Sequence, residues 1–289
     1  MLKNKTKVAL IFLFILLLIK TDYRLESTIN CCGDDFDYYI HAYTLAIDYD
    51  FNYENQIPDY SKFYYSNGNK IAPVGFSGSG ILAAPFLLLG NFLDKLFDYS
   101  NKVFNFKILL YSTSSLFYLT MSSILLQKTM LVFNKNISRI FILFLLSGSG
   151  VAYFALERFS MTHVYEVFAN SLILFLSSKA YKTNKKIYIA SIPFAIFLSL
   201  LIKLSNYYIL LIPLIVKEML AINFPEIIFK LKNKIALLSG TLASLMFFVL
   251  INFNIYGKII INPGETYAAQ GQVSNYLEST FNIFNFLFE

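Results

Sequence analysis

MTHVYEVFANSLILFLSSKAYKTNKKIYIASIPFAIFLSLLIK, residues 161–203, contains two apolar runs that a cluster of lysines separates. The first run covers 161–179 and the second covers 187–203. Each approaches the roughly 20 apolar residues that a helix needs to cross a hydrocarbon core of about 30 Å. The lysines between the runs indicate the cytoplasmic side, because short cytoplasmic loops of membrane proteins are enriched in Lys and Arg. This stretch therefore predicts two neighbouring membrane spans joined on the cytoplasmic side.

The whole chain has the composition of a membrane protein. Of its 289 residues, 56% are hydrophobic and 15% are charged, and the mean hydropathy is +0.56. These values exclude an ordinary soluble domain. The fifth and sixth apolar runs adjoin at Lys203–Asn206, so the sequence leaves the number of spans at six or seven. The predicted spans are 7–20, 105–126, 138–156, 161–179, 187–203, 206–221 and 234–254.

Lys and Arg residues recur in four clusters beside these spans. The clusters are Lys3, Lys5 and Lys7; Lys128, Lys135 and Arg139; Lys179, Lys182, Lys185 and Lys186; and Lys217, Lys230, Lys232 and Lys234. The positive-inside rule assigns all four to the cytoplasm. Counting spans alternately then places 21–104, Glu157–Met161, Lys203–Asn206 and the chain after Phe253 on the opposite side. Because the bases lie in short loops between apolar spans, the net charge of +6 does not indicate a nucleic-acid partner.

These observations predict an all-α fold, a polytopic transmembrane helical bundle of about seven spans that forms a single module, 1–289. Residues 1–20 are the first span, which lacks a small-residue cleavage site and is read as an uncleaved anchor. Residues 21–104 form a long extracytoplasmic acidic loop with short interfacial helices, and 105–254 hold the remaining spans. Residues 255–289 form an outward loop. The chain stops inside this loop, which favours an incomplete C-terminus, either of a truncated copy or of one module of a longer protein.

One further apolar stretch, 76–93, lies within the acidic loop. It contains Gly78, Gly80 and Pro85, residue types that lower the expectation of a long regular helix. We therefore predict an interfacial or re-entrant helix at this stretch instead of an eighth span.

The long extracytoplasmic loop, 21–104, is acidic and rich in tyrosine. Residues 22–59 carry nine of the chain's eighteen acids against the single base Arg24. The carboxylates of Asp34, Asp35 and Asp37 lie within four residues of one another. Carboxylates this close repel, which raises a pKa or favours a bound cation, and either suits a general base or a metal site. A solvated acidic loop is the plainer interpretation.

Ionisable residues also gather where the span 161–179 begins, and these are Glu157, Arg158, His163 and Glu166. His163 and Glu166 are three residues apart and so share one face of a helix. Ionisable residues at or within spans are costly and usually face a protein interior or cavity. The sequence leaves two roles open for these residues. Their side chains could lie at the interface and reach the lipid headgroups, or His163 and Glu166 could form a metal site together with Asp34 or His41.

Lys203 stands apart from the cytoplasmic clusters, at a predicted outward junction before Ser205 and Asn206. A lysine can bind a phosphate as a point charge. A lysine can equally extend its stem along apolar surface to place its charge in water. Both interpretations remain open from the sequence.

The order of motifs in the first loop resembles the GT-C superfamily of membrane glycosyltransferases, which includes the protein O-mannosyltransferases and the aminoarabinose lipid A transferases. Uncharacterised bacterial relatives of that group are the most similar. The motifs are Gly33-Asp34-Asp35-Phe36-Asp37-Tyr38-Tyr39, the helical spacing of 38–46, the acidic turn 48–55, Asn67-Gly68-Asn69, and Leu82-Ala83-Ala84-Pro85-Phe86. The resemblance covers roughly 5–260 and is strongest over 33–90. Two features depart from the pattern. Asp34-Asp35 replaces Asp-Glu, and Gly75-Phe76-Ser77-Gly78 replaces Pro-Pro-Gly. The second departure puts in doubt the groove that would bind the acceptor.

The resemblance implies transfer of a sugar from a polyprenyl-phosphate-linked donor to an acceptor hydroxyl or amine at the extracytoplasmic face, with inversion. It implies that Asp34 is the general base and that Asp35 orients the acceptor or a metal. Substrate binding is expected of Lys203, Arg158, His163, Glu166, His41 and Tyr38. Of these, Lys203 and Arg158 would meet the lipid phosphate.

The same resemblance implies the partners and the location. The partners are the lipid-linked sugar donor, a glycan, lipid or protein acceptor, and membrane lipids, and a divalent cation is left open as a cofactor. The location is the bacterial plasma (inner) membrane, as a multi-pass integral protein. Two other functions remain as alternatives: a non-catalytic transporter or polysaccharide-export component, and a truncated inactive glycosyltransferase copy. A transporter should carry ionisable residues near the bilayer midplane on broken helices, whereas here they gather at one predicted face.

Overall fold

The computed structural model describes residues 33–57, 64–68, 70–97, 105–221, 231–262 and 264–267. The predicted first span 1–20 and the end of the predicted outward loop, 268–289, lie outside these residues. The described part of the chain is mostly helical, which confirms the predicted fold class in its coarse form.

The elements follow one another in the order α2 (Gly33–Tyr43), the π-helical turn η1 (Thr44–Asp48), β1 (Tyr65–Asn67), β2 (Lys70–Ala72), α3 (Gly78–Leu96), α4 (Phe106–Val132), α5 (Arg139–Ser147), α6 (Val151–Leu156), α7 (His163–Thr183), α8 (Lys186–Ile202), the 3₁₀ turn η2 (Tyr207–Leu211), α9 (Ile212–Ala221), α10 (Leu231–Tyr256) and α11 (Gly264–Tyr267).

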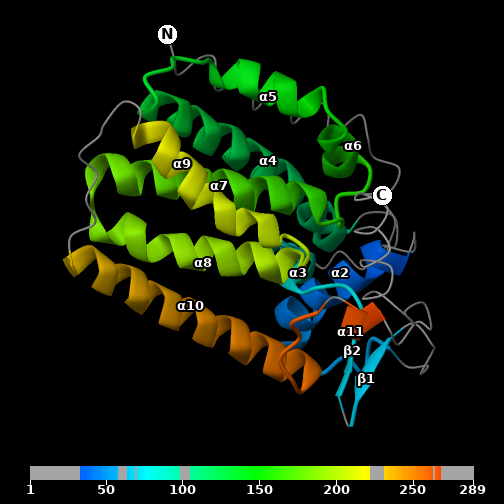
Figure 1. The fold of residues 1–289 in the computed structure, drawn as a ribbon. Coiled ribbons are helices and arrows are strands. Elements are labelled where there is room, and N and C mark those ends of the chain that lie inside the picture. Colours follow the sequence, from blue (N-terminus) through cyan, green and yellow to red (C-terminus); the bar gives the residue numbers. More distant parts are fainter. Residues whose placement is uncertain are drawn as a thin grey trace, which may run out of the picture.

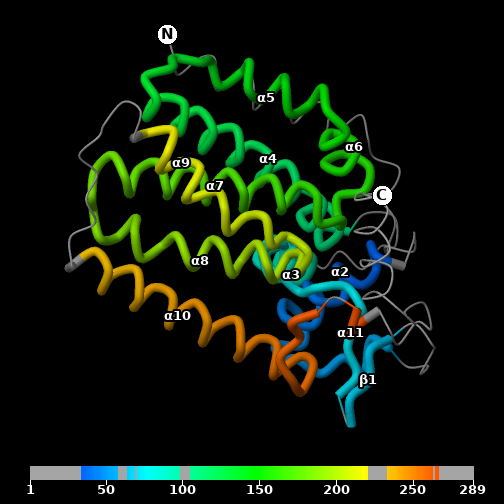
Figure 2. The backbone as a smooth tube through the Cα atoms, in the orientation of Figure 1, coloured from blue at the N-terminus to red at the C-terminus, as the bar shows by residue number. Residues whose placement is uncertain are grey.

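Four long helices form a row in the order α4, α7, α8 and α10, with each packed on the next (Figure 1). Helix α9 packs on α7, and α5 packs on the outer side of α4. The short elements α2, α6, β1, β2 and α11 gather at one end of this row, where α7 begins and where α8 and α10 end (Figures 1 and 2). This end of the molecule is called the loop end below.

In the part of the chain that the structure describes, three helices are long and apolar enough to cross a membrane: α3, α4 and the segment Asn233–Tyr256 of α10. Helix α8 is apolar but shorter, at 17 residues. The stretch 76–93, for which the sequence predicts an interfacial or re-entrant helix, forms most of α3, a helix of 19 residues that continues through Pro85. By length and composition α3 therefore also qualifies as a span.

The predicted span 138–156 is divided into α5 and α6. The break falls at Gly148-Ser149-Gly150. There Ser149 Oγ donates to the carbonyl of Leu146 and accepts from the amide of Val151. This local hydrogen bonding replaces the helical ladder, as serine side chains do at helix ends and turns.

A short antiparallel hairpin departs from the all-α prediction. Strands β1 and β2 pair Tyr65 with Ala72 and Asn67 with Lys70. Gly68 begins the two-residue turn with φ +59°, a conformation that glycine adopts without strain. The Asn67 side chain donates to the carbonyl of Tyr256 at 3.2 Å, so the hairpin is attached to the end of α10.

Small residues allow the helices at the loop end to pack closely. A Cβ at Gly80 of α3 would lie 2.5 Å from His41 Cβ and 2.9 Å from the Ala42 amide nitrogen. Only glycine permits this approach, and it presses α2 directly onto α3. Between α4 and α7, the hydroxyl groups of Ser114 and Tyr165 bond to each other at 2.7 Å. Small and hydroxylated residues of this kind are common where membrane helices contact each other.

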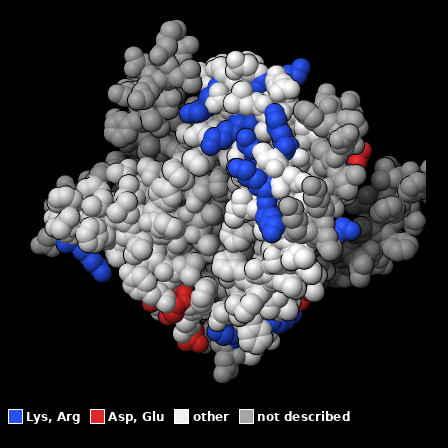
Figure 3. Space-filling model, turned by 90° about the vertical axis from the view of Figure 1, so that its left-hand side faces the viewer, with Lys and Arg blue, Asp and Glu red and all other residues white. Residues whose placement is uncertain are grey.

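Lys and Arg side chains gather over the end of the molecule opposite the loop end (Figure 3). At this end Lys182 lies in the last turn of α7, Lys186 begins α8, and Lys217 lies in the second half of α9. The two ends of the helix row therefore differ in charge, with cations at one end and the acidic helix α2 at the other.

Candidate functional site

The acidic motif forms the beginning of α2 at the loop end. Asp34 and Asp35 occupy the first helical turn, where a negative charge interacts favourably with the helix dipole. Asp34 is exposed, whereas Asp35 and Asp37 are buried. The three carboxylates, which lie within four residues of the sequence, therefore have different surroundings.

Asp35 is held by an arginine from a distant part of the chain. Arg158, in the turn between α6 and α7, donates from Nε to Asp35 Oδ2 at 2.9 Å and donates a second bond from Nη2 to the same oxygen. Ser160 Oγ adds a bond to the backbone carbonyl of Asp35 at 2.6 Å. Burial raises the pKa of Asp35, while the hydrogen bonds and the charge of Arg158 lower it. The turn 158–160 thus fixes the start of α2.

The other oxygen of this carboxylate is buried without a partner. Among the described residues, Asp35 Oδ1 makes no hydrogen bond. A buried acceptor without a donor costs roughly 1–3 kcal/mol. A ligand hydroxyl or a bound cation at Oδ1 would remove that cost.

Asp37 holds the loop that leads into α3. Its Oδ2 accepts from the amide of Gly75 at 3.0 Å, and the amide of Val74 also bonds to the carboxyl group. Burial raises the pKa of Asp37 to about 7, an effect that the two amides reduce and the charge of Asp34 increases. The sequence gives this acid no role of its own, because its partner is the backbone of a distant loop, which no pattern in the sequence indicates.

His41 and Tyr38, both expected to bind substrate, lie inside the protein. The two ring nitrogens of His41 bond to the hydroxyl of Tyr53 and to the carbonyl of Gly75, both at 2.8 Å. Complete burial lowers the pKa of His41 to about 4. The ring of Tyr38 packs against Gly75, where a Cβ would lie 2.8 Å from it. In this conformation both residues position α2 against the Gly75 loop.

A second charged group forms where α7 begins and α8 ends. Glu166 Oε1 accepts from Thr162 Oγ1 at 2.6 Å and lies 3.7 Å from His163 Nδ1 and 3.8 Å from Lys203 Nζ. The Glu166 side chain is 13% exposed and that of Lys203 is 42% exposed. The lysine that stood apart from the cytoplasmic clusters therefore has an acidic partner on the neighbouring helix.

Arg158 links the two charged groups. It lies close enough for its charge to act on Asp34 in α2 and on His163 in α7. The ring of His163 also packs on Phe154 of α6, with centroids 4.0 Å apart. Asp34, Asp35, Arg158, His163, Glu166 and Lys203 thus form one set of charged residues at the loop end, which we call the charged cluster.

The metal site that the sequence left open is not assembled. Within the described ranges, no group of three or more His, Cys, Asp or Glu side chains could hold a metal ion. His41 is directed into the interior and Glu166 is held by Thr162 and Lys203. The charged cluster pairs acids with bases instead, an arrangement that suits recognition of an anionic ligand beside a carboxylate.

Comparison with known proteins provides no further guide to this site. No family model, no curated protein and no solved structure matches the chain.

Proposed function

We propose that the chain is a membrane glycosyltransferase that moves a sugar from a polyprenyl-phosphate-linked donor to an acceptor hydroxyl or amine. The main support is that acidic and basic side chains converge at one end of the helix row. These side chains are Asp34, Asp35, Arg158, Glu166 and Lys203. They come from α2, the α6–α7 turn, α7 and the end of α8. Such a reaction requires a carboxylate and cations near one another.

In the proposed reaction, Asp34 removes the proton from the acceptor hydroxyl. The acceptor oxygen then attacks the anomeric carbon from the face opposite the phosphate. The bond between that carbon and the phosphate oxygen breaks, and the polyprenyl phosphate leaves with the electron pair, so the configuration inverts. General-base catalysis of this kind contributes roughly 10²–10⁴-fold.

Arg158 and Lys203 stabilise the leaving phosphate. Two nitrogens of Arg158 bond to Asp35, and Nη1 makes no hydrogen bond to the part of the chain that the structure describes. Lys203 Nζ lies 3.8 Å from Glu166, beyond hydrogen-bond distance, and its side chain is 42% exposed. Both cations can therefore accept an anionic ligand, and fixed cations where charge develops lower a reaction barrier.

The proposed topology places the charged cluster at the extracytoplasmic face, with about seven spans in the bacterial plasma membrane. The support is the separation of charge, because the lysines of α7, α8 and α9 lie at the opposite end of the molecule (Figure 3). Short segments rich in Lys and Arg remain in the cytoplasm. Lipid-linked sugar donors would then meet Asp34 from the outer leaflet.

The proposal is tested with purified protein in proteoliposomes and a panel of donors. Decaprenyl phosphate carrying mannose, glucose or arabinose serves as the probe, with short glycans and lipid amines as acceptors. Release of decaprenyl phosphate that depends on the protein and on an acceptor is the expected result. If no donor in the panel binds and none yields decaprenyl phosphate, the proposed reaction is wrong.

A further inference from the structure

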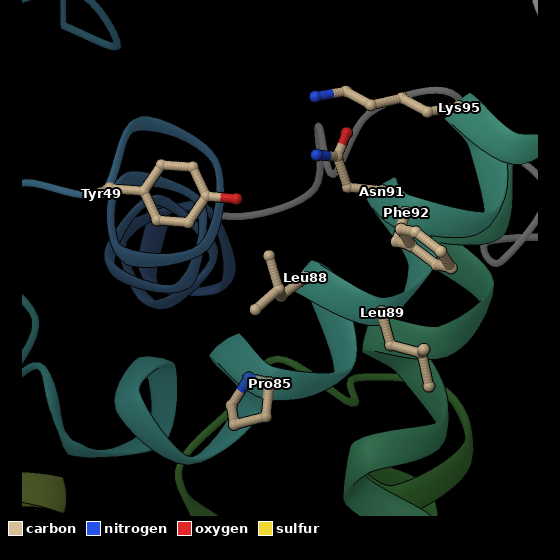
Figure 4. Close-up of a pocket in the computed structure, with 7 residues that line it drawn as sticks. All are labelled: Tyr49, Pro85, Leu88, Leu89, Asn91, Phe92 and Lys95. Carbon is tan, nitrogen blue, oxygen red and sulfur yellow. The ribbon is translucent and has the colours of Figure 1, made fainter.

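A pocket of about 540 Å³ opens on the side of α3, separate from the charged cluster. Its apolar wall consists of Pro85, Leu88, Leu89 and Phe92, and Tyr49 at the end of η1 closes the other side (Figure 4). The volume lies within the roughly 300–1,000 Å³ that is typical of ligand sites. The pocket is therefore large enough for part of an amphiphile.

The polar groups of this pocket gather at one end. The amide of Asn91 and the ammonium group of Lys95 lie on the same side of α3, and the Tyr49 hydroxyl is directed toward the space below them (Figure 4). Leu88, Leu89 and Phe92 are 40–57% exposed and occupy the rest of the site. The pocket thus has a polar end and an apolar end.

Asn91 provides a second indication of a ligand. This residue is 8% exposed, yet its amide has no hydrogen-bond partner among the described residues, although it lines the pocket. Its amide atoms are not among the fully buried, unpaired polar atoms of the described residues, so they are accessible to a polar group bound in the pocket. Because an asparagine offers both a donor and an acceptor, it can bind a phosphate oxygen or an ester carbonyl.

The charge at the polar end is positive and is not balanced by its neighbour. Lys95 forms no ion pair with any described residue. The adjacent carboxylate, Asp94, accepts from the amides of Phe106 and Lys107 at 2.8 and 3.2 Å and so caps α4. The exposed lysine is therefore available for an anion outside the protein.

We infer that this pocket binds one anionic phospholipid. Its phosphate lies against Lys95 and Asn91, and one acyl chain lies along Leu88, Leu89 and Phe92. The exposed face of α3 requires an apolar environment, because only 33% of its apolar window is buried inside the protein. This inference needs the membrane location alone, and it holds whether or not the chain transfers sugars.

The chain has no tryptophan, so one introduced tryptophan reports on this site alone. The test uses Phe92→Trp protein in phosphatidylcholine vesicles that contain a small fraction of brominated lipid, which quenches a tryptophan in contact with it. Brominated phosphatidylglycerol should quench at about fivefold lower mole fraction than brominated phosphatidylcholine, the preference expected for one lysine at an anionic surface. Leu89→Trp is a second reporter if Phe92→Trp does not fold.

Two matched controls make the test specific. Adding Lys95→Gln to the reporter should abolish the preference for phosphatidylglycerol, whereas Lys70→Gln, which removes an exposed charge from the hairpin, should preserve it. A reporter at Phe144 of α5, 72% exposed and away from the pocket, should show no preference. Equal quenching by the two lipids at Phe92 overturns the inference, and so does a preference that survives Lys95→Gln. Absence of quenching by either lipid also overturns it, because protein would then cover the site.

Discussion

Arg158 donates two hydrogen bonds to a single oxygen of Asp35, although 123 residues separate them in the chain. The pair joins the start of α2 to the turn between α6 and α7. The charge of Arg158 also acts on the exposed Asp34. The acidic motif is therefore positioned by the part of the chain that also contains His163 and Glu166 of the charged cluster.

Removal of the arginine should destabilise this end of the protein. Arg158→Gln leaves the buried Asp35 carboxylate without its cation, and a buried group that loses its partner costs about 1–3 kcal/mol. The apparent melting temperature in detergent should fall. The double variant Asp35→Asn with Arg158→Gln should recover part of the loss, because no buried charge remains. A double variant that melts below both single variants contradicts this account of the pair.

Asp37 predicts how stability depends on pH. Burial raises its pKa from 3.8 to about 7, so the folded protein retains a proton that the unfolded chain releases near pH 4. The stabilisation from protonated Asp37 is complete below about pH 4 and is lost as the pH rises to 7, by about 1 kcal/mol per pH unit. The melting temperature of the wild type should fall relative to that of Asp37→Asn between pH 5 and 7.5. A constant difference across this range would refute the assignment.

Lys203 should contribute to donor binding through its charge. Lys203→Ala should raise the KM for the lipid-linked donor roughly tenfold or more, as expected for loss of a hydrogen bond to a charged group, whereas Lys203→Arg should retain most of the affinity. Glu166→Gln is the control, because it removes the acidic partner of Lys203 and leaves the cation in place. Equal donor KM values for wild type and Lys203→Ala would assign the lysine to pairing with Glu166 alone.

The topology is tested by labelling single cysteines from outside the cell. In a background with Cys31→Ser and Cys32→Ser, a membrane-impermeant maleimide should modify Ser66→Cys in the hairpin and spare Lys185→Cys before α8. Both positions are exposed in the structure, so access of the reagent depends on the side of the membrane. Permeabilised cells should label both. The opposite pattern in intact cells removes the basis for placing the charged cluster outside.

The positions of the long helices could be predicted from the sequence because their signals are local. The runs 105–126, 161–179 and 187–203 correspond to α4, α7 and α8. The start of α4 is also local, since the Asn105 side chain accepts from the amides of Lys107 and Ile108. Hydropathy alone did not reveal the break between α5 and α6, where two glycines and a serine interrupt an apolar run.

The contacts of the candidate site could be predicted only in part. Sequence patterns identified Asp34, Asp35, Arg158, Glu166 and Lys203 as chemically significant, because charges are rare in so apolar a chain. The pairing of Arg158 with Asp35, and of Lys203 with Glu166, depends on how distant helices pack, which no local pattern encodes. The hairpin was not predicted, although Gly-Asn at 68–69 is a known signal for a two-residue hairpin turn.

The measurement that tests the central claim most directly compares decaprenyl phosphate release by wild type, Asp34→Asn and Asp37→Asn with the same donor and acceptor. Asp34 is exposed, so Asp34→Asn should fold normally and reduce transfer by roughly 10²–10⁴-fold, the usual contribution of a general base. Asp37→Asn keeps an oxygen for the Gly75 amide and should retain most of the activity. Full activity in Asp34→Asn, with loss in Asp37→Asn, would contradict the assignment of Asp34 as the base.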